Sequence, residues 1–421
     1  MKAKIIIKFI TTFLISLLLF TSCSGPSSSD SNNSDSESIS LPDSFIRGFD
    51  LSSADYWEND YADSNNADKN WYDTDGSQKS LYEILKNHGI NTVRIRVWVD
   101  PENAPVTDSN WPAANDWQAG DCTKERAVRM AKEANQAGLK ILLDFHYSDY
   151  WTDPGKQLIP LSWQNAASSD EMAKKISSYT TEVLTAFKDE SIIPDYVQVG
   201  NEIDSGILLH TSYSTSTGAE SGDESLTGKM ESTYGNFKSY ISAGCKAVRD
   251  FDKDIKIIMH VTNEYASWTI PKIESYEIDY DIIGLSYYPW EKNHGNIAKL
   301  KSNISSLKNT YSKPVIVAET SAHWNCTEGE ADTDRAYSAA HMINPDTDSI
   351  YSDLETESVN GSLQMIGSVE NQKNIIRHIM EEAADSGASG LFAWGGERRG
   401  DWKYAFFKWD GTALTSLDCF N

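Results

Sequence analysis

Short apolar segments with a preference for β structure recur eight times along the chain, and amphipathic segments lie between them. Each apolar segment ends in polar or aromatic residues, and such short β-prone runs predict strands. The eight segments are Ile46–Leu51, Thr92–Trp98, Lys140–Phe145, Tyr196–Gly200, Lys256–His260, Ile282–Tyr287, Val315–Glu319 and Gly390–Trp394. The regular alternation of strand and helix predicts α/β architecture, a closed (β/α)8 TIM barrel, in one catalytic domain over residues 44–421.

The segments between the strands carry helix signals. Ser80–His88 is followed by Gly89, and Cys122–Gln136 is followed by Gly138, as at a helix C-terminus. An open doubly wound sheet would need a glycine-rich phosphate turn after the first strand, and residues 49–52 (Phe-Asp-Leu-Ser) offer none. Long connections follow the fourth and seventh strands, at residues 203–230 and 321–372. Because barrel enzymes build their sites from loops at this end, we expect these connections to shape a cleft.

Polar and aromatic residues collect where the predicted strands end. In a barrel these positions converge on one mouth, so all of them are candidate site residues. They are Asp50, Arg94, Arg96, His146, Asn201, Glu202, His260, Tyr287, Tyr288, Glu319 and Trp394.

Glu202 and Glu319 end the fourth and seventh strands, at roughly opposite sides of the mouth. One glutamate after an apolar strand is more often a helix cap or a surface residue, but the paired placement points to chemistry. Hydrolysis of a glycoside with retention needs two carboxyl groups about 5–5.5 Å apart, one protonated and one ionised. Arg94 or Arg96 and a tyrosine ending the sixth strand favour the ionised form of Glu319. The sequence therefore predicts Glu202 as acid/base and Glu319 as nucleophile.

Composition narrows the class of partner. With 62 acidic and 37 basic residues, the formal net charge is −25, which disfavours nucleic acid and anionic polymers. The 13 Trp and 20 Tyr suit a neutral sugar polymer, although most such residues pack in cores. His146 has no second histidine at metal-ligand spacing, and no serine-hydrolase elbow or phosphate loop occurs. We expect a monomer that requires no cofactor.

The N-terminal residues carry an export signal. Lys2, Lys4 and Lys8 precede an apolar run over residues 9–20 that is too short to span a bilayer, so residues 1–22 are predicted to be a signal peptide. Residues 20–23 (Phe-Thr-Ser-Cys) resemble a bacterial lipobox, which predicts lipidation of Cys23 and an exported, membrane-anchored protein, with ordinary secretion as the alternative. Residues 23–43 are rich in Ser, Asp and Asn and are predicted to be a flexible linker.

Four further cysteines lie in the predicted catalytic domain, namely Cys122, Cys245, Cys326 and Cys419. In an exported protein they can form two disulfides, for which three pairings exist, or remain buried thiols. The sequence does not distinguish these alternatives.

Longer motifs add a family resemblance that covers nearly all of the chain from Phe45 onward. The motifs that carry it are Arg47–Ser52, Tyr72–Gly76, Asn91–Trp98, Asp144–Gln157, Gln198–Glu202, Gly284–Trp290 and Val317–Thr320. Together they resemble glycoside hydrolase family 53, the arabinogalactan endo-β-1,4-galactanases, of the clan of (β/α)8 barrels that carry catalytic glutamates on strands four and seven. Another retaining β-glycanase of the same clan and a catalytically silent glycan-binding protein are the competing interpretations, because a fold does not give a function.

The resemblance implies endo-acting, retaining hydrolysis of β-1,4-galactan, with Glu202 and Glu319 in the roles assigned above. It also implies that Asn201 binds the hydroxyl next to the reacting carbon and that Trp394 stacks on a sugar. Trp98, Trp151 and Trp290 are candidates for lining further subsites. Some bacterial relatives bind calcium after the seventh strand, where the oxygen ligands would be Glu328, Glu330, Asp332 and Asp334.

The sequence departs from the family after the eighth strand. Members often have Trp-Glu-Pro and another Trp there, whereas in this chain Gly395–Arg399 follow Trp394. Subsites on that side are therefore expected to differ.

Overall fold

A computed structural model describes residues 41–61, 68–106, 122–214, 216–289, 292–325, 356–359, 362–365, 367–400 and 402–421. Cys23, Trp290 and Cys326 lie outside the described residues, as do the four carboxylates proposed above for calcium. In the described part of the chain, no helix is long and apolar enough to cross a membrane.

Eight strands close into a barrel, in the order β1-β16-β13-β12-β11-β6-β5-β4. All neighbouring pairs in it are parallel, with β1 closing the ring between β16 and β4. The strands are β1 (Ile46–Asp50), β4 (Thr92–Val97), β5 (Lys140–Phe145), β6 (Tyr196–Val199), β11 (Lys256–Thr262), β12 (Ile282–Ser286), β13 (Val315–Thr320) and β16 (Gly390–Ala393). The predicted (β/α)8 barrel is confirmed, and each strand lies where its apolar segment predicted it.

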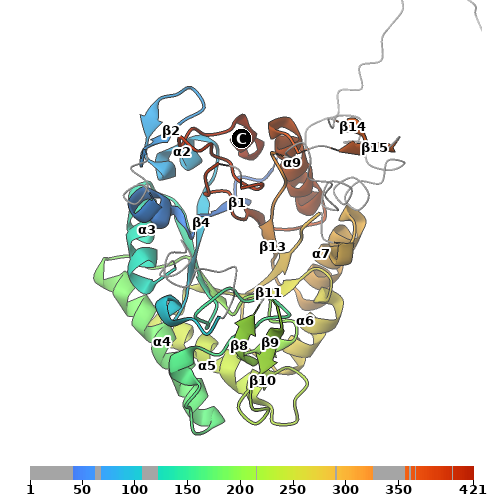
Figure 1. The fold of residues 1–421 in the computed structure, drawn as a ribbon. Coiled ribbons are helices and arrows are strands. Elements are labelled where there is room, and N and C mark those ends of the chain that lie inside the picture. The colour runs from blue at the N-terminus through green and yellow to red at the C-terminus, as the bar shows by residue number, and fades with distance from the viewer. Residues whose placement is uncertain are drawn as a thin grey trace, which may run out of the picture. The chain divides into compact units, whose positions relative to one another are not determined.

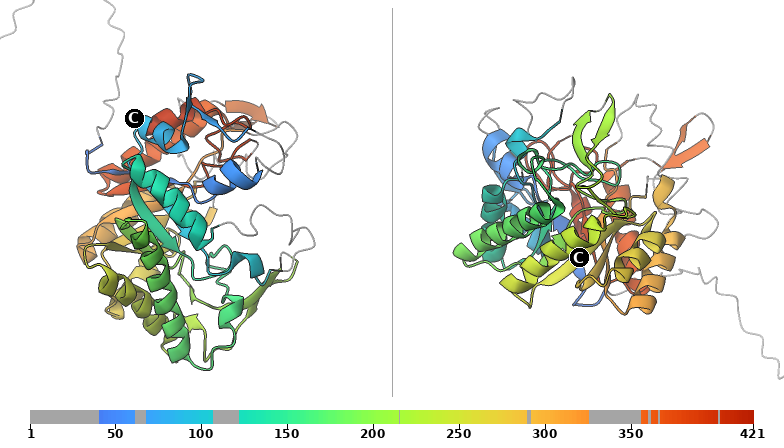
Figure 2. Two further views of the ribbon diagram at one scale, coloured as in Figure 1. Left: turned by 90° about the vertical axis from the view of Figure 1, so that its left-hand side faces the viewer. Right: turned by 90° about the horizontal axis from the view of Figure 1, so that it is seen from below.

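Helices surround the strands (Figure 1), and two further views show the same arrangement (Figure 2). They are α2 (Leu81–Asn87), α3 (Lys124–Gln136), α4 (Ser169–Asp189), α5 (Asn236–Phe251), α6 (Ala266–Ser275), α7 (Ile297–Tyr311) and α9 (Val369–Asp385). Ser80 and Glu83 form a capping box at the start of α2. Gly89 and Gly138 adopt φ of 88° and 74° after the ends of α2 and α3, in the left-handed region that glycine enters at no steric cost.

Short strand pairs and short helices lie in the loops. Antiparallel pairs join β2 (Trp71–Tyr72) to β3 (Gln78–Lys79), β7 (Gly206–Ile207) to β10 (Gly228–Lys229), β8 (His210–Ser214) to β9 (Gly218–Ser221) and β14 (Thr356–Val359) to β15 (Ser362–Met365). The single-turn and short helices are Tyr56–Tyr61, Pro101–Asn103, Leu161–Trp163, Lys292–His294 and Thr415–Phe420. The long connection predicted after β6 thus contains two strand pairs, and the yellow-green β8–β9 hairpin projects away from the helices in the right-hand view of Figure 2.

Inside the barrel, apolar side chains from alternate strand positions form one small cluster. It consists of Ile46, Leu142, Ile258, Ile282, Ile316, Ala318 and Phe392. The residues that point outward pack against the helices in the larger core. Because strand side chains alternate between faces, the inward positions that follow this cluster toward the strand ends become polar, as at Asp50, Asp144 and His260.

Two cysteines of the barrel domain are not bridged. Cys245 and Cys419 are buried free thiols, and the Cys122 sulfur lies 3.8 Å from the Ser52 carbonyl oxygen. Two disulfides would need all four of the cysteines considered above, so the two-disulfide alternative is wrong and the buried-thiol alternative holds for Cys245 and Cys419.

We predict that Gly48→Ala destabilises the barrel, because an added Cβ would lie 2.2–2.5 Å from ring atoms of Phe392 on the neighbouring strand. The expected loss in the free energy of unfolding is about 1–3 kcal/mol, as for overpacking of a core. Gly155→Ala is the control, since its Cβ would meet nothing closer than an Asp153 oxygen at 3.5 Å. Urea denaturation of both variants checks the prediction, and equal stability would contradict it.

Candidate active site

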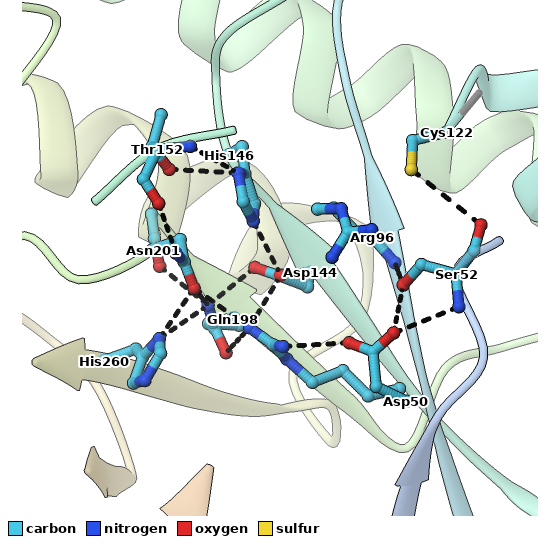
Figure 3. Close-up of polar contacts among 12 residues, drawn as sticks. Asp50, Ser52, Arg96, Cys122, Asp144, His146, Thr152, Gln198, Asn201 and His260 are labelled. Carbon is cyan, nitrogen blue, oxygen red and sulfur yellow. Dashed lines mark hydrogen bonds and ion pairs between the residues drawn. The ribbon is translucent and has the colours of Figure 1, made fainter. Parts of the chain in front are cut away.

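One buried arginine, Arg94 on β4, organises the mouth of the barrel. Its guanidinium lies 2.9 Å from Asp50 Oδ2, 2.8 Å from Asp144 Oδ2 and 2.8 Å from Glu319 Oε1. It also donates to Asn201 Oδ1 at 2.9 Å. Burial opposes the charged form of Arg94, but these three carboxylates raise its pKa above the ordinary value. Four strands are therefore tied together through one cation. Figure 3 shows the labelled polar side chains of Asp50, Asp144, Gln198, Asn201 and His260 gathered in this buried network.

Glu319 is turned into the mouth by an irregularity in β13. The strand register shifts between Leu285 and Ser286 and again between Val317 and Thr320, as at a β-bulge. Ala318 already points into the barrel interior, so regular alternation would send Glu319 outward. The bulge instead brings Glu319 to Arg94 and to Tyr288, whose hydroxyl donates to Glu319 Oε2 at 2.6 Å.

Glu202 lies in a strained turn directly after β6. Its φ is +46°, a left-handed conformation that non-glycine residues rarely adopt, and it follows Gly200 at +84°. The Gln157 side-chain amide donates to the carbonyl oxygens of Asn201 at 2.8 Å and of Glu202 at 3.2 Å, which stabilises the turn. Among the residues that the structure describes, no cation lies within ion-pair distance of Glu202.

The two carboxyl groups differ in their electrostatic surroundings. Burial raises the pKa of both, since Glu202 is only 8% and Glu319 only 5% exposed. Arg94 and the Tyr288 hydroxyl act in the opposite direction on Glu319. The charge of Glu319 raises the pKa of Glu202 further, well above the ordinary value for glutamate. The arrangement therefore favours a proton on Glu202 and a negative charge on Glu319.

A chain of hydrogen bonds orients the side chain of Asn201. Its Nδ2 donates to the Thr152 carbonyl oxygen at 2.8 Å, so its Oδ1 is the acceptor for Arg94 and for His260 Nδ1 at 2.8 Å. His260 consequently carries its proton on Nδ1, and its Nε2 accepts from Ser286 Oγ at 2.8 Å. Burial, followed by the nearby charge of Arg94, lowers the pKa of His260 well below the ordinary value.

His146 is held in one tautomer. Its Nδ1 accepts from the Thr152 backbone amide at 3.1 Å, so the proton lies on Nε2, which donates to Asp144 Oδ2 at 3.1 Å. Burial lowers the pKa of His146, and Asp144 partly opposes that effect. Burial also disfavours ionisation of Asp144, but Arg94 and His146 together lower its pKa to about 2.

These side chains surround an open cavity of about 340 Å³. Seven residues predicted from the sequence line it, namely His146, Trp151, Asn201, Glu202, Tyr288, Glu319 and Trp394. Asp50, Arg94, Arg96 and His260 are buried behind the wall of the cavity rather than in it. The guanidinium of Arg96 lies 3.7 Å from the centre of the Trp151 ring, a cation–π contact that holds this indole in place.

Two further predicted residues do not line the cavity. Tyr287 lies in the hydrophobic core between barrel and helices, because neighbouring residues after a strand point to opposite faces and Tyr288 takes the inner one. Trp98 is only 1% exposed and its ring lies edge to face with that of Trp151, 5.5 Å between centroids. Neither side chain lines the cavity, and contact of either residue with substrate stays a prediction. Trp290 lies outside the described residues.

Several residues of the site were missed by sequence reasoning. Thr152, Asp153, Lys156 and Tyr404 also line the cavity. The first three lie within the Asp144–Gln157 motif, so the motif itself was the available signal. Tyr404 lies in the loop after β16, where no periodicity marks it.

The buried network contains three further polar residues, Asp144, Gln198 and Ser286. Gln198 donates to Asp144 Oδ1 at 2.6 Å and accepts from Arg94 at 3.3 Å. Each is a polar residue at an inward position of an apolar strand, which is a signal that alternation could have revealed.

No group of three or more His, Cys, Asp or Glu side chains suited to a metal ion occurs among the described residues. The carboxylates proposed for calcium lie outside these residues, so that prediction is not addressed by the structure.

A family model described as glycosyl hydrolase family 53 matches residues 46–420, which is almost the whole described barrel. The chain belongs to glycosyl hydrolase family 53. It is therefore a glycoside hydrolase, and the match spans every strand of the barrel and both strand-end glutamates.

Named relatives support the family assignment. The endo-β-1,4-galactanase of Bacillus subtilis is 30% identical over 356 residues, which are 83% of this chain and 69% of that protein. The arabinogalactan endo-β-1,4-galactanase of Cellvibrio japonicus is 33% identical over 259 residues, which are 60% of this chain and 61% of that protein.

A solved structure of the family has the same fold. The family 53 catalytic domain of Ignisphaera aggregans superposes with a TM-score of 0.68 at 28% identity, covering 91% of this chain and 97% of that chain. A fungal β-1,4-galactanase superposes with a TM-score of 0.65 at 24% identity, covering 90% of this chain and 99% of that chain.

We predict that Arg94→Met lowers the free energy of unfolding by about 3–5 kcal/mol near neutral pH, because buried carboxylates lose their cation. Without Arg94, the pKa values of Asp144 and Glu319 rise in the folded state. A carboxyl group whose pKa is higher in the folded than in the unfolded state stabilises the folded state at low pH. The loss in the free energy of unfolding of Arg94→Met should therefore become smaller as the pH falls from about 7 to about 4.5.

Lys132→Met is the control, because its side chain is 49% exposed and pairs at 2.6 Å with Glu190, which is itself 43% exposed. A surface pair contributes about 0–1 kcal/mol. Urea denaturation at both pH values measures the two variants, and a deficit for Arg94→Met that is small or independent of pH would contradict the prediction.

Proposed function

We propose that the chain hydrolyses β-1,4-galactosidic bonds within galactan, with retention of configuration, using Glu202 as acid/base and Glu319 as nucleophile. The observation that carries the proposal is the unequal environment of two buried strand-end glutamates around one open cavity. The substrate is proposed from the Bacillus subtilis and Cellvibrio japonicus relatives, which are endo-β-1,4-galactanases. The groups that contact the sugar are positioned by five polar side chains, namely Asp50, Arg94, Arg96, His146 and His260. An aromatic surface for the sugar is provided by Trp151 and Trp394.

In the first step, Glu319 attacks the anomeric carbon while Glu202 donates its proton to the departing glycosidic oxygen. Arg94 binds one oxygen of Glu319 and Tyr288 the other, so the attacking carboxylate is held in one orientation before bond formation. Asn201, whose Nδ2 already donates to the Thr152 carbonyl oxygen, lies beside Glu202 and can present its amide to the hydroxyl next to the reacting carbon.

In the second step, water displaces the sugar from Glu319 and Glu202 accepts the proton of that water. Formation of the glycosyl ester removes the negative charge of Glu319, which is one cause of the raised pKa of Glu202. The pKa of Glu202 therefore falls when a base is needed and rises again when Glu319 is released.

Product analysis tests the proposal as a whole. The purified protein should reduce the viscosity of β-1,4-galactan faster than reducing ends appear, as an enzyme that cleaves within chains does. The first products seen by NMR should be β-anomers. Cleavage of β-1,4-mannan or a β-glucan in preference to galactan would instead support another retaining glycanase, and binding without cleavage would support a silent glycan-binding protein.

We predict that Glu202→Ala loses about 10²–10⁴-fold of its activity on galactan, because a sugar leaving group needs protonation as the bond breaks. An aryl galactoside with a phenol of low pKa does not need it, so this variant should still form the glycosyl-enzyme from that substrate. Azide should then accelerate turnover and give the β-azide, because two successive displacements preserve configuration.

Glu319→Ala is the companion variant for this experiment. It has no nucleophile, so azide can only attack the activated substrate directly and give the α-azide by one inversion. An α-azide product from Glu202→Ala, or equal losses on the aryl substrate and on galactan, would refute the assignment of Glu202.

We further propose that the protein is exported and held at a membrane by lipid on Cys23, as the N-terminal residues predict. The serine-rich segment after Cys23 would then act as a tether between the lipid and the catalytic domain. We also expect the catalytic domain to be monomeric.

We predict that Cys23→Ser moves the protein from the membrane fraction to the soluble fraction, because the acyl chains on Cys23 are the proposed hydrophobic anchor. Fractionation of cells that express each form, followed by galactanase assay of both fractions, measures the shift. Persistent membrane association of the variant would contradict the lipid anchor.

A further inference from the structure

A second open cavity, of about 450 Å³, adjoins the first. Asp153 and Lys156 line the active-site cavity, whereas Pro154 and Gly155, between them in the same turn, line the second. Two backbone hydrogen bonds of 3.0 Å between Asp153 and Lys156 close this turn. The two cavities are therefore separated by a single turn of the chain, with one on each side.

The second cavity is also connected to the segment that carries Glu202. Asn201 and Glu202 line the first cavity, and Asp204 and Ser205 line the second. Ser205 Oγ donates to the Pro154 carbonyl oxygen at 2.7 Å, which joins this segment to the turn. A polymer chain that leaves the active-site cavity past Glu202 therefore meets the second cavity next.

Two aromatic side chains form one wall of the second cavity. Tyr265 and Trp268, at the start of α6, are 44% and 46% exposed, although both are large and apolar. An exposed aromatic pair in one cavity is a feature of ligand-binding surfaces. The exposed side chains of Lys229 and Glu231 lie at the same cavity and can bind hydroxyl groups.

The aromatic wall is fixed relative to Glu202 by buried hydrogen bonds. Asp204 is buried, and it accepts from the Thr262 backbone amide at 3.0 Å and from Thr269 Oγ1 at 3.2 Å. Thr269 follows Trp268 in α6, and Ile203 donates to the His260 carbonyl oxygen at 3.1 Å. The position of Trp268 is thus set by the same loop that carries the proposed acid/base.

The chemistry of the reaction indicates which part of the substrate this cavity faces. The acid/base protonates the oxygen that departs with the leaving group, so the leaving-group sugars lie on its side of the reacting bond. The cavity adjoins the loop of Glu202, whereas Trp394 and Tyr404 come from β16 and the loop that follows it. A β-galactopyranosyl unit has an axial O4, which leaves a continuous C–H face suited to stacking on an aromatic ring.

We propose that Tyr265 and Trp268 form a subsite for β-1,4-linked galactosyl residues on the leaving-group side of the cleaved bond. The inference rests on the proposed function. It assigns to this chain a binding surface beyond the reacting sugar and explains why two large aromatic side chains stay exposed beside the active site.

The test uses a β-1,4-galactopentaose carrying ¹⁸O at its reducing end, so that mass spectrometry identifies which bond is cleaved. Trp268→Ala should shift cleavage toward the reducing end, because sugars on the leaving-group side bind less tightly and fewer of them occupy that side. The ratio of kcat/KM for the pentaose to that for an aryl galactotrioside should fall about three- to tenfold, as expected for an aromatic stacking contact. Trp268→Phe should restore most of this ratio.

Ile193→Ala is the matched control, because Ile193 is 43% exposed but precedes β6 at the opposite end of the barrel. Its cleavage pattern should equal that of the unmodified protein. If Trp268→Ala still cleaves galactan but its cleavage pattern on the pentaose is unchanged, the proposed subsite is refuted. A shift of cleavage toward the non-reducing end would refute it as well. Failure of the unmodified protein to cleave any β-1,4-galactan would instead refute the proposed function.

Discussion

The site depends on one buried cation. Arg94 is fully enclosed and contacts Asp50, Asp144 and Glu319, which come from three other strands. Enclosing an arginine without compensation is costly, and enclosing three carboxylates without a cation is costlier still, so neither group is stable there alone. This mutual requirement joins the stability of the barrel mouth to the orientation of Glu319.

The same cation also separates the two glutamates electrostatically. Both glutamates are buried, but only Glu319, and not Glu202, contacts Arg94. The positive charge of Arg94 and the Tyr288 hydroxyl favour the ionised form of Glu319. Glu202 experiences burial and the charge of Glu319, and both raise its pKa. Two identical side chains thereby acquire different electrostatic surroundings, which favour the proton on Glu202 and the negative charge on Glu319.

Backbone irregularities bring these side chains to the cavity. The bulge in β13 turns Glu319 inward directly after Ala318, and the left-handed turn at Glu202 places that residue beyond the end of β6. Strain of this kind persists only where surrounding contacts stabilise it, as the Gln157 amide does at Asn201 and Glu202. The loop after Glu202 then continues to Asp204, which anchors the helix carrying Trp268. The two glutamates and the aromatic surface beside them are therefore parts of one connected structure.

The sequence by itself determined the eight strands, their order of alternation with helices and the residues that collect at the barrel mouth. It could do so because strand burial and helix capping are local properties, read from neighbouring positions such as Ser80 and Glu83 or Gly89 and Gly138. It also placed Glu202 and Glu319 at the ends of two strands. Only the tertiary structure decided that Tyr288 rather than Tyr287 faces the site, that Trp98 supports Trp151 from behind, and that Cys245 and Cys419 are not bridged. Those outcomes depend on strand register, a bulge and contacts between distant segments, and none of these is encoded in a local pattern of residues.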